Sequence, residues 1–217
     1  MPTTDDATAR PDPREETAGG GFPWSRPEPS RRRRLLGLLT GLTLVVLVVD
    51  QLTKIWAVAA LAPGERTALL GDLFGLQLVR NEGAALGIAS GMTWVLTLVA
   101  IVVVAVVVRS ARRIGSTGWA LALGLLLGGA TGNLVDRLVR EPGPGRGHVI
   151  DFLAYGNLFI GNVADIAIVA AAVLVVLLTA RGVHLDGSHD GDAQDGTPGE
   201  GTPGEGTPAA GREGGAA

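Results

Sequence analysis

Residues 148–178, HVIDFLAYGNLFIGNVADIAIVAAAVLVVLL, give the strongest indication of how this chain folds. It carries two aspartates, Asp151 and Asp165, and an unbroken apolar run follows the second one from residue 166 to residue 178. An ionisable group in or beside a membrane span is costly, so such a residue is by default a functional candidate. We therefore expect a short loop that brings the two carboxyl groups together at the start of a membrane helix, where the pair shares a proton.

Long apolar blocks recur through the middle of the chain. Hydrophobic residues make up 47% of the 217 residues, and arginines flank the blocks in which they gather, as in a single multi-pass membrane domain. About 20 apolar residues are enough to cross the ~30 Å hydrocarbon core of a bilayer. The pattern predicts a mainly α membrane protein with four transmembrane helices, at about residues 35–62, 92–109, 118–139 and 158–180.

The remaining segments are of other kinds. Residues 63–91 have mixed polarity and several turn signals, and the run from Leu73 to Val79 is typical of a strand. We expect a small β-rich extracytoplasmic layer here, between the first and second helices. Residues 1–34 and 182–217 are rich in proline, glycine and charge, so they cannot bury enough apolar surface to offset ordering. They are predicted to be disordered tails.

The first apolar block could also be a signal peptide, because four arginines, Arg31–Arg34, precede it. Asp50 and Lys54 interrupt the apolar region that a signal peptide requires, and the apolar character resumes as far as Leu61. We therefore interpret the block as a membrane span that carries a charged pair in its second half.

Four spans place both termini on one side of the membrane, and arginines decide which side it is. Arg31–Arg34, Arg181 and the group at 109–113 fall on the side of the termini, so both termini are expected in the cytoplasm. The polar residues within or beside the spans then all lie towards the extracytoplasmic leaflet. They are Asp50, Lys54, Asn133, Asp136, Arg137, Asp151 and Asp165. This clustering predicts a site on that side.

Two carboxyl groups held close in a place of low dielectric cannot both ionise. The ionised member can activate a water, while the protonated member polarises a carbonyl and then protonates the leaving amine. The chain has no cysteine and three histidines, so thiol catalysis is excluded, and we expect neither a metal nor a cofactor. The plainer interpretation is that Asp151 is a loop residue and Asp165 a helix-end residue, although Asn162 precedes Asp165 by three positions.

The other polar residues leave alternatives open. Asp50 and Lys54 are spaced to pair along one helix face, either as a structural pair or in contact with substrate. Arg137 could pair with Asp136, with an acid on another helix or with a lipid phosphate. Asn81 could serve a turn or the site. Glycines repeat every four residues in the third span, which favours close helix packing; they are Gly124, Gly128 and Gly132.

Five short motifs together resemble bacterial signal peptidase II, the lipoprotein signal peptidase family. They occur in the family's order between about residues 34 and 181: Asp50-Gln-Leu-Thr-Lys54, Asn81-Glu-Gly-Ala-Ala-Leu-Gly87, Gly128-Gly-Ala-Thr-Gly-Asn-Leu-Val-Asp-Arg137, Val149-Ile-Asp-Phe152 and Asn162-Val-Ala-Asp165. Leu86 replaces a frequent phenylalanine, and Gly161-Asn162 replaces a commoner Phe-Asn. Neither departure touches the two aspartates.

The resemblance implies an aspartic endopeptidase, residues 35–181, in the inner membrane of a bacterium. It would cut diacylglyceryl-modified prolipoproteins immediately before the lipidated cysteine and release the signal peptide. Asp151 and Asp165 would be the catalytic pair. Substrate binding or support of the site would come from Asn81, Gly83, Asn133, Arg137, Asn162 and Ala164, with Asp50, Lys54 and Asp136 as structural polar residues. The expected partners are lipid-modified prolipoproteins and membrane phospholipid, with no nucleic acid, and we expect a monomer.

Two other functions remain open on the residues alone. A small transporter or proton relay would spread its charged groups through the depth of the membrane. An assembly factor would use the glycine face of the third span to bind a partner and would need no paired acids. Replacement of Asp165 by asparagine separates these possibilities, because only a peptidase loses cleavage and keeps its fold.

Overall fold

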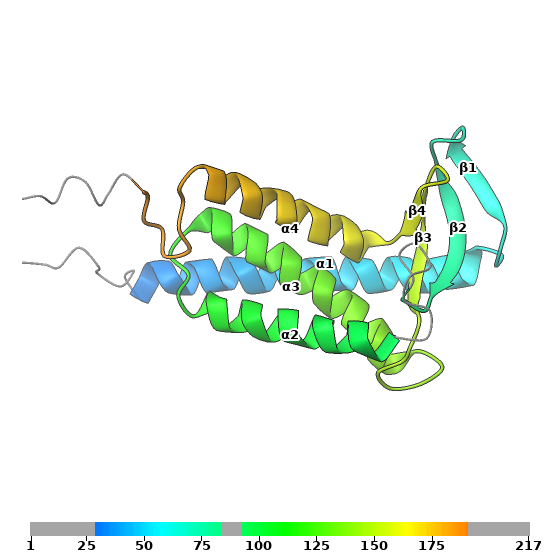
Figure 1. The fold of residues 1–217 in the computed structure, drawn as a ribbon, viewed down its shortest axis with the longest axis horizontal. Helices are drawn as coiled ribbons and strands as arrows, with labels where there is room; N and C mark the ends of the chain where they lie inside the picture. Colours follow the sequence, from blue (N-terminus) through cyan, green and yellow to red (C-terminus); the bar gives the residue numbers. More distant parts are fainter. Residues whose placement is uncertain (1–28, 84–92, 191–217) are drawn as a thin grey trace, which may run out of the picture.

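The computed structural model describes residues 29–83 and 93–190 (Figure 1). Most of the two expected tails, and the end of the segment 63–91, lie outside the described residues. The elements are α1 (Pro29–Ala60), β1 (Arg66–Leu70), β2 (Phe74–Asn81), α2 (Thr93–Ala111), α3 (Thr117–Val139), β3 (Val149–Tyr155), β4 (Phe159–Gly161) and α4 (Val163–Ala180). In these residues, four helices are long and apolar enough to cross a membrane, as predicted.

The outer surface of the helical bundle is apolar. Large side chains on three different helices are exposed, among them Val45 (59%), Val106 (57%) and Val169 (63%). A surface of this kind would be an aggregation liability in water, whereas lipid tails cover it at no cost. The bundle is therefore built for a bilayer.

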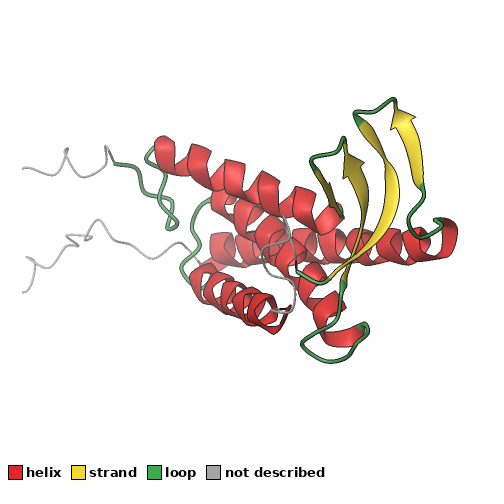
Figure 2. Cartoon of the chain, turned by 45° about the vertical axis from the view of Figure 1, so that its right-hand side comes forward, coloured by secondary structure: helices red, strands yellow, loops and turns green. Residues whose placement is uncertain are grey.

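Helix α3 lies between the other helices and contacts each of them (Figures 1 and 2). Its glycines allow this close approach, as the sequence predicts. A Cβ atom on Gly128 would lie 2.7 Å from Cβ of Val46 on α1, and one on Gly129 would lie 2.5 Å from the carbonyl oxygen of Ala164 on α4. Both distances are shorter than van der Waals contact, so a larger residue at either position would push the helices apart.

The four strands form one antiparallel sheet, in the order β1-β2-β3-β4, across one end of the bundle (Figure 2). The sequence prediction of a β layer was correct but incomplete. It placed strands only between the first two helices, whereas β3 and β4 come from the segment between α3 and α4, which was expected to be a loop. Ile150 and Phe152 of β3 are buried against Ala57 of α1 and Leu78 of β2, and this apolar contact makes the segment a strand.

Two helices begin elsewhere than predicted. Helix α1 starts at Pro29, so the residues from Arg31 to Arg34 are helical and do not belong to a disordered tail. Helix α4 starts at Val163, five residues later than expected, because β4 occupies residues 159–161 and Asn162 caps the helix. The side chain of Asn162 accepts a hydrogen bond from the backbone N–H of Asp165, as N-capping residues do.

The first part of the predicted C-terminal tail is folded onto the bundle. The indole N–H of Trp119 donates to the carbonyl oxygen of Val183 at 2.8 Å. The backbone N–H of Gly115 donates to the carbonyl oxygen of Leu185 at 2.9 Å. Residues 182–190 therefore close the end of the bundle opposite the sheet, and this part of the disorder prediction was wrong.

Candidate active site

Strand β3 and the N-terminus of α4 bring the carboxyl groups of Asp151 and Asp165 to the same residue, Asn162. The Nδ2 of Asn162 donates to Oδ1 of Asp151 at 2.6 Å, and its backbone N–H donates to Oδ2 of Asp165 at 3.0 Å. Asn162 and Asp165 form a capping box, in which each side chain accepts from the backbone N–H of the other. A single residue therefore contacts both carboxyl groups and fixes one of them.

Two further asparagines complete the hydrogen bonding of the two carboxyl groups. The Nδ2 of Asn81, at the end of β2, donates to Oδ2 of Asp151 at 2.7 Å. The Nδ2 of Asn133, on α3, donates to Oδ1 of Asp165 at 2.9 Å. Each of the four carboxyl oxygens thus accepts a hydrogen bond from a neutral N–H group, and within residues 29–83 and 93–190 no positively charged side chain forms a salt bridge with either carboxyl group.

The proton affinity of Asp151 is raised by its surroundings. Its side chain is 2% exposed, and this burial, the largest influence, raises its pKa to about 6. The hydrogen bond from Asn81 acts in the opposite direction, and the negative charge of Asp165 raises the pKa further. Asp151 therefore holds a proton more readily than an ordinary aspartate does, as a shared-proton pair requires.

Behind the two aspartates lies a buried ionic network around Lys54. Its Nζ atom is 2.8 Å from Oδ2 of Asp50, 2.8 Å from Oδ2 of Asp136 and 3.0 Å from Oδ1 of Asn133. The side chains of the three charged residues are fully buried. The predicted pair of Asp50 and Lys54 is present, and it extends to α3 and, through Asn133, towards Asp165.

Of the three partners left open for Arg137, Asp136 does not pair with it among the described residues. Asp136 binds Lys54 and the Nε of Arg140, the latter at 2.7 Å. Arg137 donates from Nη1 to the carbonyl oxygen of Asn133 on its own helix, and its buried Nε has no hydrogen-bond partner among the described residues. Adjacent helix residues point about 100° apart, whereas Asp136 and Arg140 are four positions apart and share a face.

Gly83 and Ala164, the two small residues of the predicted site, act through their backbones. The N–H of Gly83 donates to Oδ1 of Asn81 at 2.8 Å, and its φ of 121° favours glycine. The N–H of fully buried Ala164 donates to Oδ1 of Asp50 at 2.9 Å, which joins the start of α4 to the ionic network.

The sequence prediction missed two residues of this region. The Nε2 of Gln51 contacts Asp50, the carbonyl oxygen of Gly132 and Asp136. Arg140 binds Asp136, and the separation of four residues between them is a sequence pattern that indicates such a pair on a helix. Gln51 stands inside the motif 50–54, but nothing in the sequence shows which way its side chain points. Among residues 29–83 and 93–190, no three histidine, aspartate or glutamate side chains are placed to hold a metal ion.

Comparison with known proteins places this chain in a family. The family model described as signal peptidase (SPase) II matches residues 42–181. A lipoprotein signal peptidase of Rhodococcus jostii is 49% identical over 190 residues, which cover 88% of this chain and 94% of that protein. The lipoprotein signal peptidase of Mycobacterium tuberculosis strain H37Rv is 46% identical over 186 residues, 86% of this chain and 91% of that protein.

Two solved structures, both described as bacterial membrane enzymes studied by the in meso method, share the fold. One aligns with a TM-score of 0.60 and 22% identity over 76% of this chain and 95% of its own. The other aligns with a TM-score of 0.58 and 24% identity, covering 66% and 92% of the two chains.

Proposed function

Because the chain belongs to the signal peptidase II family and is therefore a hydrolase of peptide bonds, we propose that it processes prolipoproteins. The substrate is a diacylglyceryl-modified precursor in the bacterial membrane, and the cut falls immediately before the lipidated cysteine. Asp151 and Asp165 form the catalytic pair. The observation that carries this proposal is that Asn162 donates hydrogen bonds to both carboxyl groups.

The reaction needs one carboxylate and one carboxylic acid. The raised pKa of Asp151 makes it the member that retains the proton. The ionised Asp165, beside the partial positive charge of the α4 N-terminus, takes a proton from water as the water oxygen attacks the scissile carbonyl carbon. Asp151 donates a hydrogen bond to the developing oxyanion. When the carbon–nitrogen bond breaks, the pair returns a proton to the leaving amine.

The neighbouring side chains would hold the substrate backbone. The buried Nε of Arg137 has no acceptor among the residues described, so a carbonyl oxygen of the signal peptide can satisfy it. Asn81 and Asn133 keep the two carboxyl groups in place through the hydrogen bonds described above. A single chain supplies every one of these groups, so the proposed site needs no residue from a second copy.

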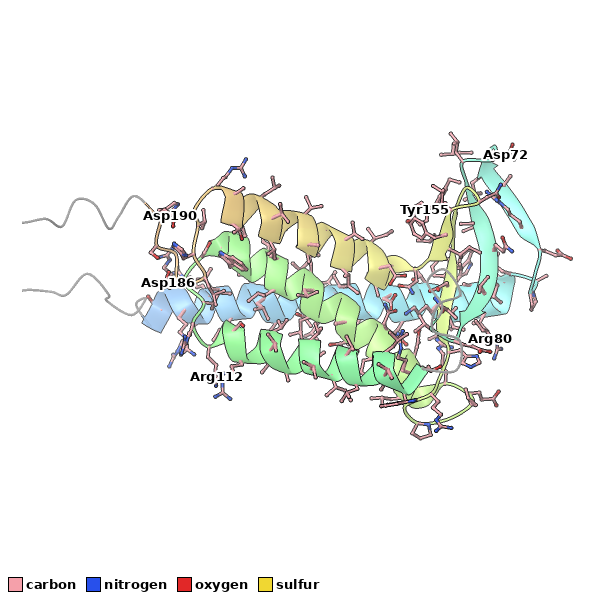
Figure 3. All side chains as sticks on the ribbon, in the orientation of Figure 1. Asp72, Arg80, Arg112, Tyr155, Asp186 and Asp190 are labelled. Carbon is pink, nitrogen blue, oxygen red and sulfur yellow. The ribbon has the colours of Figure 1, made fainter. Side chains whose placement is uncertain are left out.

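The site faces the extracytoplasmic side, and both termini lie in the cytoplasm. The arginine distribution supports this orientation, and the absence of cysteine makes it easy to test. Exposed Asp72 and Arg112 lie at opposite ends of the molecule (Figure 3). In intact cells, a membrane-impermeant maleimide should label Asp72→Cys and should label Arg112→Cys only after permeabilisation. The reverse pattern would refute the orientation.

The cleavage proposal is tested with the purified chain and a lipid-modified prolipoprotein. Asp151→Asn and Asp165→Asn should each lose cleavage by at least about 10³-fold, because the water is no longer activated or the amine no longer protonated. Asp72→Asn changes an exposed aspartate in the turn between β1 and β2; it is the matched control and should keep full activity. Full activity in either site variant would sink the assignment, and cleavage of an unmodified precursor at the same rate would remove the lipid requirement.

The two alternative functions fit the structure less well. A proton relay needs charged groups along the depth of the bundle, but the buried ionic groups gather at the sheet end, around Asp50, Lys54 and Asp136. An assembly factor would leave the glycines of α3 free to receive a partner, yet Gly128 and Gly129 already pack against α1 and α4.

A further inference from the structure

A cleft of about 340 Å³ opens beside the end of α3, on the face of the sheet opposite Asp151. Small-molecule sites have volumes of roughly 300–1,000 Å³. Arg80 pairs with Ile150 in the β2–β3 ladder, and Val79 pairs with Asp151. Successive strand residues point to opposite faces, so the cleft is separate from the candidate active site. Its lining consists of Arg80, Val139, Arg140, Glu141, His148 and Ile150.

The cleft has unused positive charge. Arg80 is exposed and makes no side-chain hydrogen bond or ion pair with any residue that the structure describes (Figure 3). Arg140 binds Asp136 through Nε, and together with Lys54 it balances the two buried carboxylates of Asp50 and Asp136. Arg80 is therefore the cation of the lining that an anionic group can still pair with, and the remaining Nη donors of Arg140 face the same cleft. His148 lies 3.9 Å from Glu82.

The cleft also borders the surface that faces lipid. Helix α3 is one of the candidate membrane spans and ends at Val139, which is 77% exposed, and Leu138 before it is 43% exposed. Apolar side chains thus give way to arginines within two residues, from Leu138 to Arg140. Hydrocarbon gives way to phosphate over the same short depth at the edge of a bilayer.

We propose that this cleft binds the headgroup of a membrane phospholipid. The phosphodiester oxygens lie against Arg80 and Arg140, because planar guanidinium groups match phosphate oxygens in geometry and charge. A hydroxyl or ammonium of the headgroup donates to Glu141, and an acyl chain runs along Leu138 and Val139. The inference rests on α3 crossing the membrane and does not depend on the cleavage reaction.

The test uses the full chain in a neutral detergent, titrated with short-chain phosphatidylglycerol and followed by native mass spectrometry. The comparison ligands are the diacylglycerol with the same chains and inorganic phosphate. The variants are Arg80→Gln and a matched control, Arg146→Gln, which removes an exposed arginine outside the cleft. Both variants should unfold within about 2 °C of the wild type, because neither side chain has a partner among the described residues.

We expect Arg80→Gln to weaken phosphatidylglycerol binding about tenfold, as the loss of one charge-assisted hydrogen bond does, and Arg146→Gln to change it less than twofold. The diacylglycerol and phosphate alone should bind at least tenfold more weakly than the phospholipid. Equal losses in the two variants would show diffuse surface attraction and overturn the proposal. If the diacylglycerol binds as tightly as phosphatidylglycerol, the cleft does not recognise the headgroup and the proposal is wrong. If phosphate alone binds as tightly as phosphatidylglycerol, the ligand is not a lipid.

Discussion

The pH dependence of stability tests the environment of Asp151 directly. The pKa of this carboxyl group is about 6 in the folded protein, against an ordinary value of 3.8. The folded state therefore binds the proton more tightly than the unfolded state does. The stabilisation is fully present below pH 3.8 and is lost as the pH rises through 6, when the buried group must ionise.

The size of this effect follows from the two pKa values. A difference of one unit between the folded and unfolded pKa values corresponds to about 1.4 kcal/mol. Ionisation of Asp151 should therefore lower the free energy of unfolding by about 3 kcal/mol between pH 3.8 and pH 7. For a chain of this length, 1 kcal/mol moves the unfolding temperature by roughly 2–4 °C. The contribution of this single group is therefore roughly 6–12 °C.

Asp151→Asn isolates the effect from all other titrating groups. The variant has no charge at this position, so the difference between its unfolding temperature and that of the wild type should grow in its favour from pH 4 to pH 7. A constant offset is also expected. Asn81 and Asn162 both point Nδ2 at residue 151, and the amide of the variant offers only one oxygen to them. This mismatch costs about 1–3 kcal/mol at every pH.

Tryptophan fluorescence follows the unfolding in detergent, and Asp72→Asn, an exposed aspartate in the turn between β1 and β2, is the control. For the control, the difference in unfolding temperature from the wild type should not change with pH. If the same difference for Asp151→Asn is also independent of pH, or falls as the pH rises, burial does not raise the pKa of this carboxyl group. The assignment of the proton to Asp151 is then wrong.

Four further outcomes are expected. Lys54→Met should cost about 3–5 kcal/mol in thermal unfolding, because it leaves two buried carboxylates without their cation; a cost below about 1 kcal/mol would contradict the network. Asn162→Ala should lose about 1–2 kcal/mol as a missing cap and also lower kcat, whereas unchanged kcat would show that the residue serves only the helix. The kcat/KM for cleavage should fall about tenfold per pH unit above the pKa of Asp151, near 6, and a rate independent of pH from 5 to 8 would exclude a protonated Asp151. Gly128→Leu should destabilise the fold by about 1–3 kcal/mol or more through overpacking, while Gly41→Leu, which meets open space, should not; equal effects would deny the close helix contact.

The sequence predicted the helices well because their signal is long and local. A run of apolar residues between arginines needs no knowledge of the rest of the chain. The glycines of α3 were also readable, since a spacing of four places Gly124, Gly128 and Gly132 on one helix face. The structure adds which neighbour each of them meets, and Gly132 lies under a carboxylate of Asp50.

The sheet was harder to predict because its strands are short and far apart in sequence. Strand β3 reads as a mixed segment between a glycine-rich loop and a turn, and only its pairing with β2 makes it a strand. The start of α4 was misplaced for a related reason. Residues 158–161 are apolar enough to continue a membrane helix, but the capping box at Asn162 fixes its first turn. That shift places Asp165 at the third helical position, where its side chain can receive the N–H of Asn162.

The orientation of the amide groups shows why the ionic network belongs to the site. Lys54 can only donate hydrogen bonds, so Oδ1 of Asn133 must face it, and Nδ2 of Asn133 is then left for Asp165. The backbone N–H of Asp165 can likewise only donate, which fixes Oδ1 of Asn162 and turns its Nδ2 towards Asp151.

Asn81 is held in the same way by the N–H of Gly83, which binds its Oδ1 and leaves its Nδ2 for Asp151. Every amide that touches the two carboxyl groups is therefore oriented by a group that cannot reverse its role. Lys54 is a positioning residue in this scheme, since it contacts Asn133 and makes no hydrogen bond to either aspartate of the pair among the described residues. Exchange of Lys54 for methionine leaves Oδ1 of Asn133 with only the hydrogen bond from Nδ2 of Asn162 at 3.2 Å, so Asn133 is held less firmly and kcat should fall further than the loss of folded protein accounts for. A kcat per folded molecule equal to that of the wild type would separate the ionic network from the chemistry.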